Sequence, residues 1–254
     1  MDISRDLEKH MSFWDHLEEL RWTLLRCLAA LFIATGIGFV FTSAIYGVLQ
    51  RPLSSLGGRV ELVFSGPLDA FLIRLKLAVL TGVILALPFM LAFIWRFVAP
   101  GLRGRERSVI WGAVAAGTVF FCVGAVFGYY LLFFGLPALV RLGVSGPGVR
   151  HLWSLKSYMD FCFRFVLAFG VVFEFPVITV ALARLGLLEA STLRRIRPYA
   201  VIGIFVLAAF ITPPDPVTQV MLGLPLLVLY EASIFVTGIL ERKPDAAAGG
   251  RSAN

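Results

Sequence analysis

Residues 71–98 of the chain read FLIRLKLAVLTGVILALPFMLAFIWRFV. Between Lys76 and Arg96 this stretch contains nineteen residues without a charged side chain. A helix needs about 20 mostly apolar residues to cross the hydrocarbon core of a bilayer. The stretch therefore predicts a membrane-spanning helix.

Further apolar stretches on both sides of it indicate the fold class. Of the 254 residues, 59% are apolar and 15% are charged, with a mean hydropathy of +0.86, whereas soluble domains carry about 25% charged residues. We expect an all-α polytopic membrane protein, with residues 1–242 as one domain. Its six transmembrane helices are predicted at about residues 22–44, 71–98, 108–136, 158–183, 199–211 and 217–240. The fifth stretch is too short to cross a bilayer of ordinary thickness.

The segments outside these stretches are predicted to be interfacial or irregular. Residues 1–21 are charged, and their last part is amphipathic, as in a helix that lies at the membrane interface. Prolines and glycines indicate loops at 50–58 and 137–157, and the basic stretch 184–197 is expected to be a loop as well. Residues 243–254 are small and polar, and we expect a disordered tail there.

The positions of the Lys and Arg side chains predict the orientation. Six spans place both termini and two of the loops on one side of the membrane. Fourteen of the 23 Lys and Arg residues lie on that side, in the tails, in those two loops or near the adjoining ends of the spans. Five lie in the loops on the other side. Because cytoplasmic loops carry the excess of basic residues, both termini are predicted to be cytoplasmic. The net charge of +7 favours contact with anionic lipid over contact with nucleic acid.

No cofactor, metal or catalytic site is predicted. Cys27, Cys122 and Cys162 stand singly in apolar stretches and form no cluster with the histidines, which favours buried apolar thiols over metal ligands or a disulfide. The stretch Gly143-Val-Ser-Gly146 mimics the nucleophile motif of intramembrane serine proteases of the rhomboid class. However, no histidine follows His151 to act as the base. The chain is therefore not predicted to be an enzyme.

Two carboxylates within the predicted spans are candidate functional groups. Glu174 lies near the middle of the fourth span, where inserting a charge costs about 2.5–3.5 kcal/mol. It is expected to face a polar cavity or a partner, or to be protonated, although a carboxylate satisfied only by helix packing is the simpler reading. Pro176 frees a nearby backbone carbonyl, which also favours a polar environment. Glu231, in the sixth span, is a second candidate for the same cavity.

Residue spacing predicts contacts made by the spans. Gly124 and Gly128 are spaced for close approach of another helix. Asp160 and Arg164 lie four residues apart, the acid first, and are expected to pair along one helix. Two cations at the start of the second span are expected to extend toward the interface: Arg74 and Lys76.

Two further carboxylates stand among basic residues on the predicted cytoplasmic side. Glu19 lies in His16-Leu-Glu-Glu-Leu-Arg21, and Glu106 lies in Arg103-Gly-Arg-Glu-Arg107. An acid in such a setting usually pairs within the chain, and an exposed pair is worth only about 0–1 kcal/mol. Two separated carboxylates at one surface can instead bind two guanidinium groups from another molecule.

Five motifs in order give the chain a resemblance to the TatC family, over nearly its whole length. The N-terminal H-L-x-E-L-R pattern of that family matches residues 16–21, and its first inner loop matches Phe97-Val-Ala-Pro-Gly-Leu102 followed by Glu106-Arg107. The F-G-x-x-F-E-x-P pattern of its fourth span matches residues 169–176. Two later motifs match Arg197-Pro-Tyr199, and Thr212-Pro-Pro-Asp215 with Gln219.

The resemblance implies a function. Proteins similar to this one bind the twin-arginine signal of folded cargo at the cytoplasmic face of the bacterial inner membrane, and use the proton-motive force to export the cargo. By the motif matches Glu19 and Glu106 would hold the arginine pair, and the surrounding surface would be shaped by Arg21, Phe97 and Leu102. Glu174 would be the polar group in the concave, glove-like cavity typical of the family.

The resemblance also implies partners. Single-span TatA- and TatB-type subunits would contact the fifth and sixth spans and a proline of the first outer loop, through Thr212, Asp215, Gln219 and Pro52. Copies of the chain would associate in a receptor complex. The chain departs from the family pattern after the first motif, where Trp22 and Thr23 replace a second basic residue, and at Arg103, where relatives often have an aromatic residue. These departures affect the fine shape of the signal-binding surface.

A second function class stays open on the residues alone. Glu174, Glu231 and the proline-interrupted spans also suit a proton-coupled secondary transporter of small solutes. Many such transporters are built from internal repeats, and the two halves of this chain show no convincing repeat. Binding of a twin-arginine peptide or of a small solute would separate the two functions.

Overall fold

The computed structural model describes residues 13–54, 56, 60–98, 107–142, 151–211 and 216–241. Within these ranges the chain forms six helices and two short strands. In chain order they are α1 (Phe13–Ser54), β1 (Val60–Val63), α2 (Asp69–Val98), α3 (Arg107–Leu142), β2 (His151–Ser154), α4 (Leu155–Arg184), α5 (Ala190–Ile211) and α6 (Pro216–Glu241). The all-α, six-helix prediction is confirmed.

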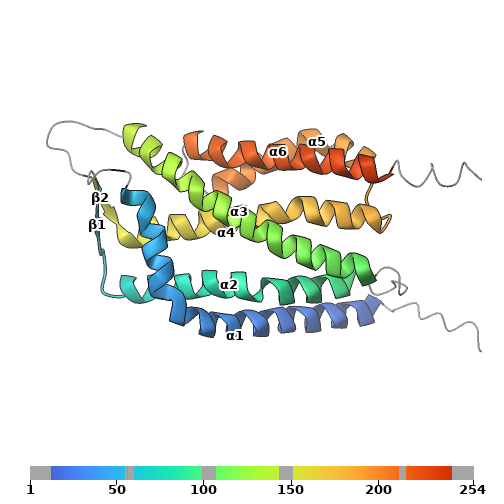
Figure 1. The fold of residues 1–254 in the computed structure, drawn as a ribbon, viewed down its shortest axis with the longest axis horizontal. Helices are drawn as coiled ribbons and strands as arrows, with labels where there is room; N and C mark the ends of the chain where they lie inside the picture. Colours follow the sequence, from blue (N-terminus) through green and yellow to red (C-terminus); the bar gives the residue numbers. More distant parts are fainter. Residues whose placement is uncertain are drawn as a thin grey trace, which may run out of the picture.

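The helices lie side by side along the long axis of the molecule (Figure 1). α3 crosses the bundle diagonally, and the last part of α1 turns away from α2. β1 and β2 lie at one end, which we call the strand end. The beginning of α1 and the end of α6 are both at the opposite end, on different sides of the bundle, and we call it the N–C end. Six helices thus return the chain to the end at which it started.

Five of the helices are long and apolar enough to span a membrane: α1, α2, α3, α4 and α6. α5 differs because its first half carries Arg194, Arg195 and Arg197, and the apolar residues begin only after them. We expected those arginines in a loop. The structure instead places them in the first turns of a 22-residue helix, so α5 extends well beyond the apolar stretch that marks it in the sequence.

Glycines set the close contact of α3 with α4, as their spacing predicted. A Cβ on Gly124 would lie 2.5 Å from the Phe169 carbonyl oxygen, and one on Gly128 would lie 2.9 Å from the Phe169 Cβ. Real Cβ atoms do not approach so closely, so only glycine fits at either position. The rings of Phe121, Phe165 and Phe169 are almost fully buried around this contact. α1 packs on α2 in the same way, with Gly38 against the Ala78 carbonyl.

The strand end contains structure that the sequence did not reveal. β1 and β2 pair in parallel, with Val60 opposite His151 and Val63 opposite Ser154. We expected loops over 50–58 and 137–157. Instead α1 continues to Ser54 and α3 to Leu142, so each helix contains a proline that was expected to lie in a loop: Pro52 and Pro137.

Two tyrosine hydroxyls stabilise the proline-containing end of α1. Pro52 has no N–H, so the carbonyl four residues earlier, at Val48, lacks its helical donor. The Tyr129 hydroxyl of α3 donates to that carbonyl at 3.1 Å. The Tyr158 hydroxyl of α4 donates to the neighbouring Leu49 carbonyl at 2.6 Å. Both bonds join residues far apart in the sequence, so the residues around Pro52 could not reveal that the helix continues through them.

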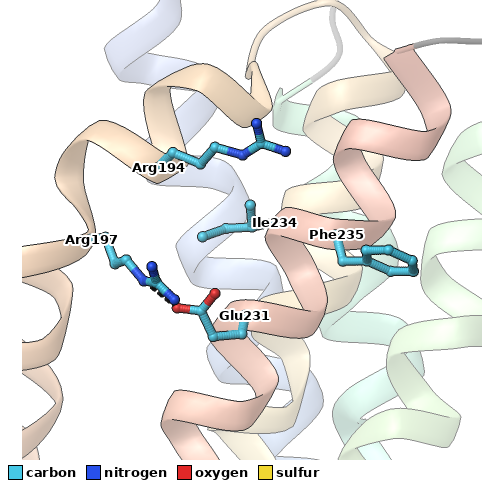
Figure 2. A pocket seen from close by; sticks show the side chains of 5 residues that line it. All are labelled: Arg194, Arg197, Glu231, Ile234 and Phe235. Carbon is cyan, nitrogen blue, oxygen red and sulfur yellow. Dashed lines mark hydrogen bonds and ion pairs between the residues drawn. The ribbon is translucent and has the colours of Figure 1, made fainter.

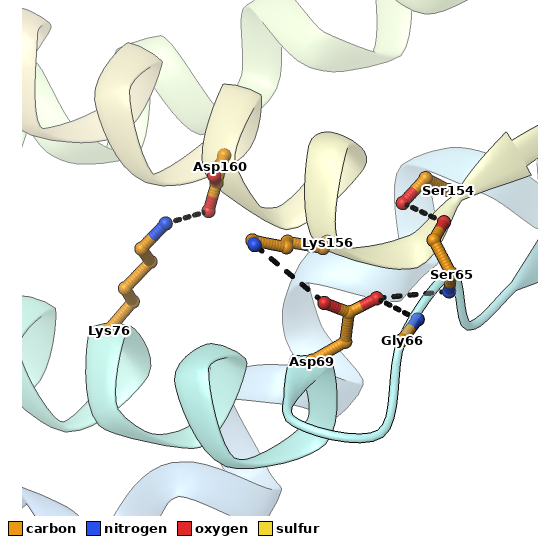
Figure 3. A network of polar contacts seen from close by, with 7 residues as sticks. All are labelled: Ser65, Gly66, Asp69, Lys76, Ser154, Lys156 and Asp160. Carbon is orange, nitrogen blue, oxygen red and sulfur yellow. Dashed lines mark hydrogen bonds and ion pairs between the residues drawn. The ribbon is translucent and has the colours of Figure 1, made fainter.

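Charged groups connect α2 to α4 near the strand end (Figure 3). Lys76 forms an ion pair with Asp160, and Lys156 lies 3.7 Å from Asp69. Asp69 also accepts hydrogen bonds from the backbone N–H groups of Ser65 and Gly66, at 2.9 and 2.8 Å. The predicted pairing of Asp160 along its own helix was therefore wrong. Asp160 pairs with Lys76 on α2, which lies close enough for a bond between helices.

Candidate functional site

The first candidate site lies where the beginning of α1 meets the end of α2, at the N–C end. The His16 ring stacks on the Phe97 ring, with centroids 4.5 Å apart and planes 17° apart. Trp95, one turn before the end of α2, is buried at this end. The stack joins the first motif of the chain to the residue that opens the second motif. The structure therefore brings Phe97 beside the segment that carries Glu19.

Glu19 lies one turn beyond His16 on the same helix and is half-buried. Its Oε2 is shielded from solvent and has no hydrogen-bond partner among the residues that the structure describes. A carboxylate oxygen in such a position is a strong acceptor for a charged donor, because leaving it unpaired costs free energy. Arg21, also predicted for this site, is exposed.

Two predicted members of this site, Leu102 and Glu106, lie outside the described residues. The described chain resumes at Arg107, where α3 begins. His16 is a member that sequence reasoning missed as a site residue, although it opens the first motif. The signal that could have found it is its position: His16 is an aromatic ring one helical turn before Glu19 in the motif at residues 16–21.

The second candidate site is Glu174, inside the bundle. Its side chain is buried, and its Oε1 has no hydrogen-bond partner within the described ranges. The carboxylate lies against α3 at a glycine, because a Cβ on Gly117 would be 2.7 Å from Glu174 Oε2. The same Cβ would be 2.8 Å from the Leu91 side chain of α2. Glu174 therefore stands where α2, α3 and α4 meet, and Gly117 gives its carboxylate room.

The third carboxylate, Glu231, belongs to a different contact. Its Oε1 accepts a hydrogen bond from Arg197 Nε of α5 at 2.5 Å. With Arg194, Ile234 and Phe235 the pair lines a pocket of about 350 Å³ between α5 and α6 (Figure 2). Glu174 does not line this pocket, contrary to the expectation that the two acids share a cavity. Arg197 begins the Arg-Pro-Tyr motif, and its pairing was not foreseen.

The residues predicted for partner contacts are placed only in part. Gln219 is half-buried, and its side-chain amide donates to the Phe205 carbonyl of α5 at 3.1 Å. Pro52 is fully buried within the chain, so a partner could reach its ring only if the end of α1 moved. Thr212 and Asp215 lie outside the described residues.

Comparisons with known proteins identify the same family as the sequence motifs do. The sequence model of the family "Sec-independent protein translocase protein (TatC)" matches residues 15–225. A TatC protein of Desulforapulum autotrophicum is 40% identical over 250 residues, which cover 96% of this chain and 90% of that protein. A TatC protein of Carboxydothermus hydrogenoformans is 34% identical, over 93% of this chain and 96% of that protein.

The fold also matches solved structures. A crystal structure of a twin-arginine translocase receptor, TatC, superimposes with a TM-score of 0.80 at 34% sequence identity. The match covers 88% of this chain and 98% of the crystallised chain. The six-helix arrangement described above therefore belongs to a fold already seen in a protein of related sequence.

Proposed function

This chain belongs to the TatC family of Sec-independent protein translocase proteins, and from that premise we propose that it is the receptor subunit that binds twin-arginine signal peptides. It is a multi-pass membrane protein with a role in protein translocation, and its family consists of translocase components and not of enzymes. The signal, the partners and the energy source are the parts that we propose.

One observation carries the proposal: the buried Glu19 oxygen without a partner in the described chain, held beside the His16–Phe97 stack. The stack fixes the beginning of α1 against the end of α2. The carboxylate is therefore held in position before any ligand arrives, which lowers the entropy cost of binding. A half-buried carboxylate binds a guanidinium more strongly than an exposed one does, because solvent screens it less.

The ligand follows from the chemistry of two acids. Arg presents a planar fork of donors that binds a carboxylate through two parallel hydrogen bonds, whereas Lys presents a single compact charge. Glu19 and Glu106 would each take one arginine of the signal, with Arg21, Phe97 and Leu102 forming the surface around them. The resulting preference for two arginines over two lysines is the signature of this proposal.

The remaining parts of the proposed function concern the membrane and the partners. From the family we place the protein in the inner membrane of a bacterium. The N–C end would face the cytoplasm, because most of the basic residues lie at the termini and in the loops on their side. TatA- and TatB-type single-span subunits would join the α5–α6 region near Thr212, Asp215 and Gln219. Copies of the chain would associate in the receptor complex, and the proton-motive force would drive transport of folded cargo.

The test is the binding of a twin-arginine signal peptide and of its twin-lysine version to the purified protein in nanodiscs. Glu19→Gln and Glu106→Gln should each weaken the twin-arginine complex, by about tenfold for the loss of a charge-assisted pair. Glu18→Gln is the matched control, since Glu18 is exposed and next in sequence. Equal binding of both peptides, or unchanged binding in the Glu19/Glu106 double variant, would refute the receptor role.

The same experiment addresses the second function class. Family membership supports protein translocation and leaves the small-solute transporter without an observation of its own. A solute that binds with Glu174-dependent affinity, in a protein indifferent to signal peptides, would reverse this preference.

A further inference from the structure

The pocket between α5 and α6 lies near the N–C end of the bundle. Arg194 is the fifth residue of α5, and the residues from Glu231 to Phe235 lie within the last three turns of α6. Figure 2 shows the two arginines approaching from α5, with the carboxylate, Ile234 and Phe235 presented by α6. The volume of about 350 Å³ is within the range of small-ligand sites.

The charges that line this pocket do not balance. Arg197 has its carboxylate partner in Glu231. Arg194 has no carboxylate partner anywhere in the part of the chain that the structure describes. Its guanidinium lies against α6, since a Cβ on Gly238 would be 3.5 Å from Arg194 Nη2. Among the described lining residues two cations face one anion, so this part of the lining carries a net charge of one positive unit.

The surroundings of this charge are apolar. Ile234 forms a buried wall of the pocket, and Phe235 at its edge is 69% exposed. α6 is one of the helices apolar enough to span a membrane, over Thr218–Leu240. Arg194 is itself exposed, so an anion can reach its guanidinium from outside the protein. Other apolar side chains of α6 are exposed as well, so an anion bound here would also have an apolar surface nearby: Val228, Val236 and Ile239.

We propose that this pocket binds the phosphate group of an anionic phospholipid. The two guanidiniums supply the planar forks that bind phosphate oxygens, and Phe235 supplies the apolar surface along which an acyl chain would lie. Basic pockets between transmembrane helices bind the head groups of anionic lipids for this reason. The proposal rests on the chain being a multi-pass membrane protein, and not on the binding of signal peptides.

Native mass spectrometry of the full chain in detergent, titrated with phosphatidylglycerol, tests the proposal. Arg194→Gln should lower the affinity of the tightest-bound lipid by about five- to tenfold, since a basic residue near a membrane contributes roughly this factor. Arg195→Gln is the matched control: Arg195 is the next residue, is exposed and does not line the pocket. Equal losses for the two variants would overturn the site, because they would indicate only a general effect of charge.

A third variant predicts a change of opposite sign. Glu231→Gln removes the acid that competes with phosphate for Arg197, so phosphatidylglycerol should bind several-fold more tightly than to the unaltered protein. Weaker binding in this variant would refute the proposed role of the pair. Zwitterionic phosphatidylcholine should bind less well than phosphatidylglycerol, because its choline cation offsets the charge of its phosphate.

Two other outcomes identify a different occupant. If inorganic phosphate at millimolar concentration displaced the lipid fully, the site would be one for a soluble anion. If Arg194→Gln left lipid binding unchanged but reduced the amount of co-purified single-span subunit, the pocket would bind an acidic segment of a protein partner. Either result would overturn the lipid assignment. Signal-peptide binding measured on the same samples distinguishes these outcomes from a failure of the proposed receptor function.

Discussion

Tyr129 of α3 donates its hydroxyl hydrogen to the Val48 carbonyl of α1, the carbonyl that Pro52 deprives of its helical donor. The bilayer core holds no water that could donate to an unpaired carbonyl, so the Tyr129 bond replaces the backbone hydrogen bond that proline removed. A side chain from another helix therefore allows α1 to continue through a residue that normally ends one. It also ties the end of α1 to α3.

Removing this hydroxyl should destabilise the protein in a way that depends on Pro52. Tyr129→Phe is expected to lower the free energy of unfolding by about 1–2 kcal/mol, since it leaves the Val48 carbonyl unpaired. In a Pro52→Ala background the restored N–H satisfies that carbonyl, and Tyr129→Phe should then cost little. A double-mutant cycle from denaturant unfolding in detergent measures the coupling. Tyr130→Phe, at an exposed neighbour, is the control, and additive losses would contradict the assignment.

The glycine contact of α3 with α4 gives a second prediction. Gly124→Ala places a methyl group 2.5 Å from the Phe169 carbonyl oxygen, a backbone atom that cannot rotate away. Overpacking of this kind costs about 1–3 kcal/mol. Gly112→Ala, on the same helix with nothing within 4 Å of the new Cβ, should instead be neutral or stabilise by up to about 1 kcal/mol. Thermal unfolding of the two variants side by side decides the matter. Equal melting temperatures would refute the close contact.

The ion pair of Lys76 with Asp160 gives a third. Lys76→Met removes the cation and leaves Asp160 with its side chain only 19% exposed. We expect a loss of about 1–3 kcal/mol in unfolding free energy, below the cost for a fully buried pair because Lys76 remains partly exposed. The double variant Lys76→Met with Asp160→Leu should recover most of the loss. Arg164→Gln is the control, and a larger effect there would restore the helical pairing expected from the sequence.

Replacing Glu174 should affect the stability of the protein and its transport activity in different ways. Replacing it by Leu removes a buried carboxylate with an unpaired oxygen in the described chain, so the unfolding free energy should stay equal or rise by about 1–3 kcal/mol. Signal-peptide binding should remain, because Glu19 lies on a different helix and is untouched. Export of folded cargo into inverted membrane vesicles should fall at least tenfold if the carboxylate acts in the proposed cavity. Normal export by Glu174→Leu would remove Glu174 from the mechanism.

The sequence predicted what local composition controls. Apolar stretches located the helices, and the spacing of Gly124 and Gly128 identified the surface of α3 that meets α4. Prediction was wrong where a partner from far along the chain decides the outcome. Proline ends a helix in most settings, and here the distant Tyr129 hydroxyl supplies a hydrogen bond to the carbonyl that Pro52 leaves without its helical donor.

The same limit applies to the candidate sites. The motif around His16 and Glu19 was recognisable, yet the His16–Phe97 stack depends on how α1 packs against α2. Glu231 was noticed as a charge inside a span, but its partner Arg197 lies in a segment that the sequence presented as a loop. Pairing between helices is not encoded in residue spacing along one helix, and for that reason these contacts were missed.

The parallel pairing of β1 with β2 has a consequence for biogenesis. Val60 and His151 are opposite one another although 91 positions separate them, and α2 and α3 intervene. A ribosome adding about 5–20 residues per second needs roughly 5–20 s to supply the second strand. During that interval α1 and α2 can already be inserted, while the backbone of β1 waits with an unpaired edge. The strand end therefore cannot close before β2 has been made, and until then the edge of β1 is open to a chaperone or to a misplaced strand.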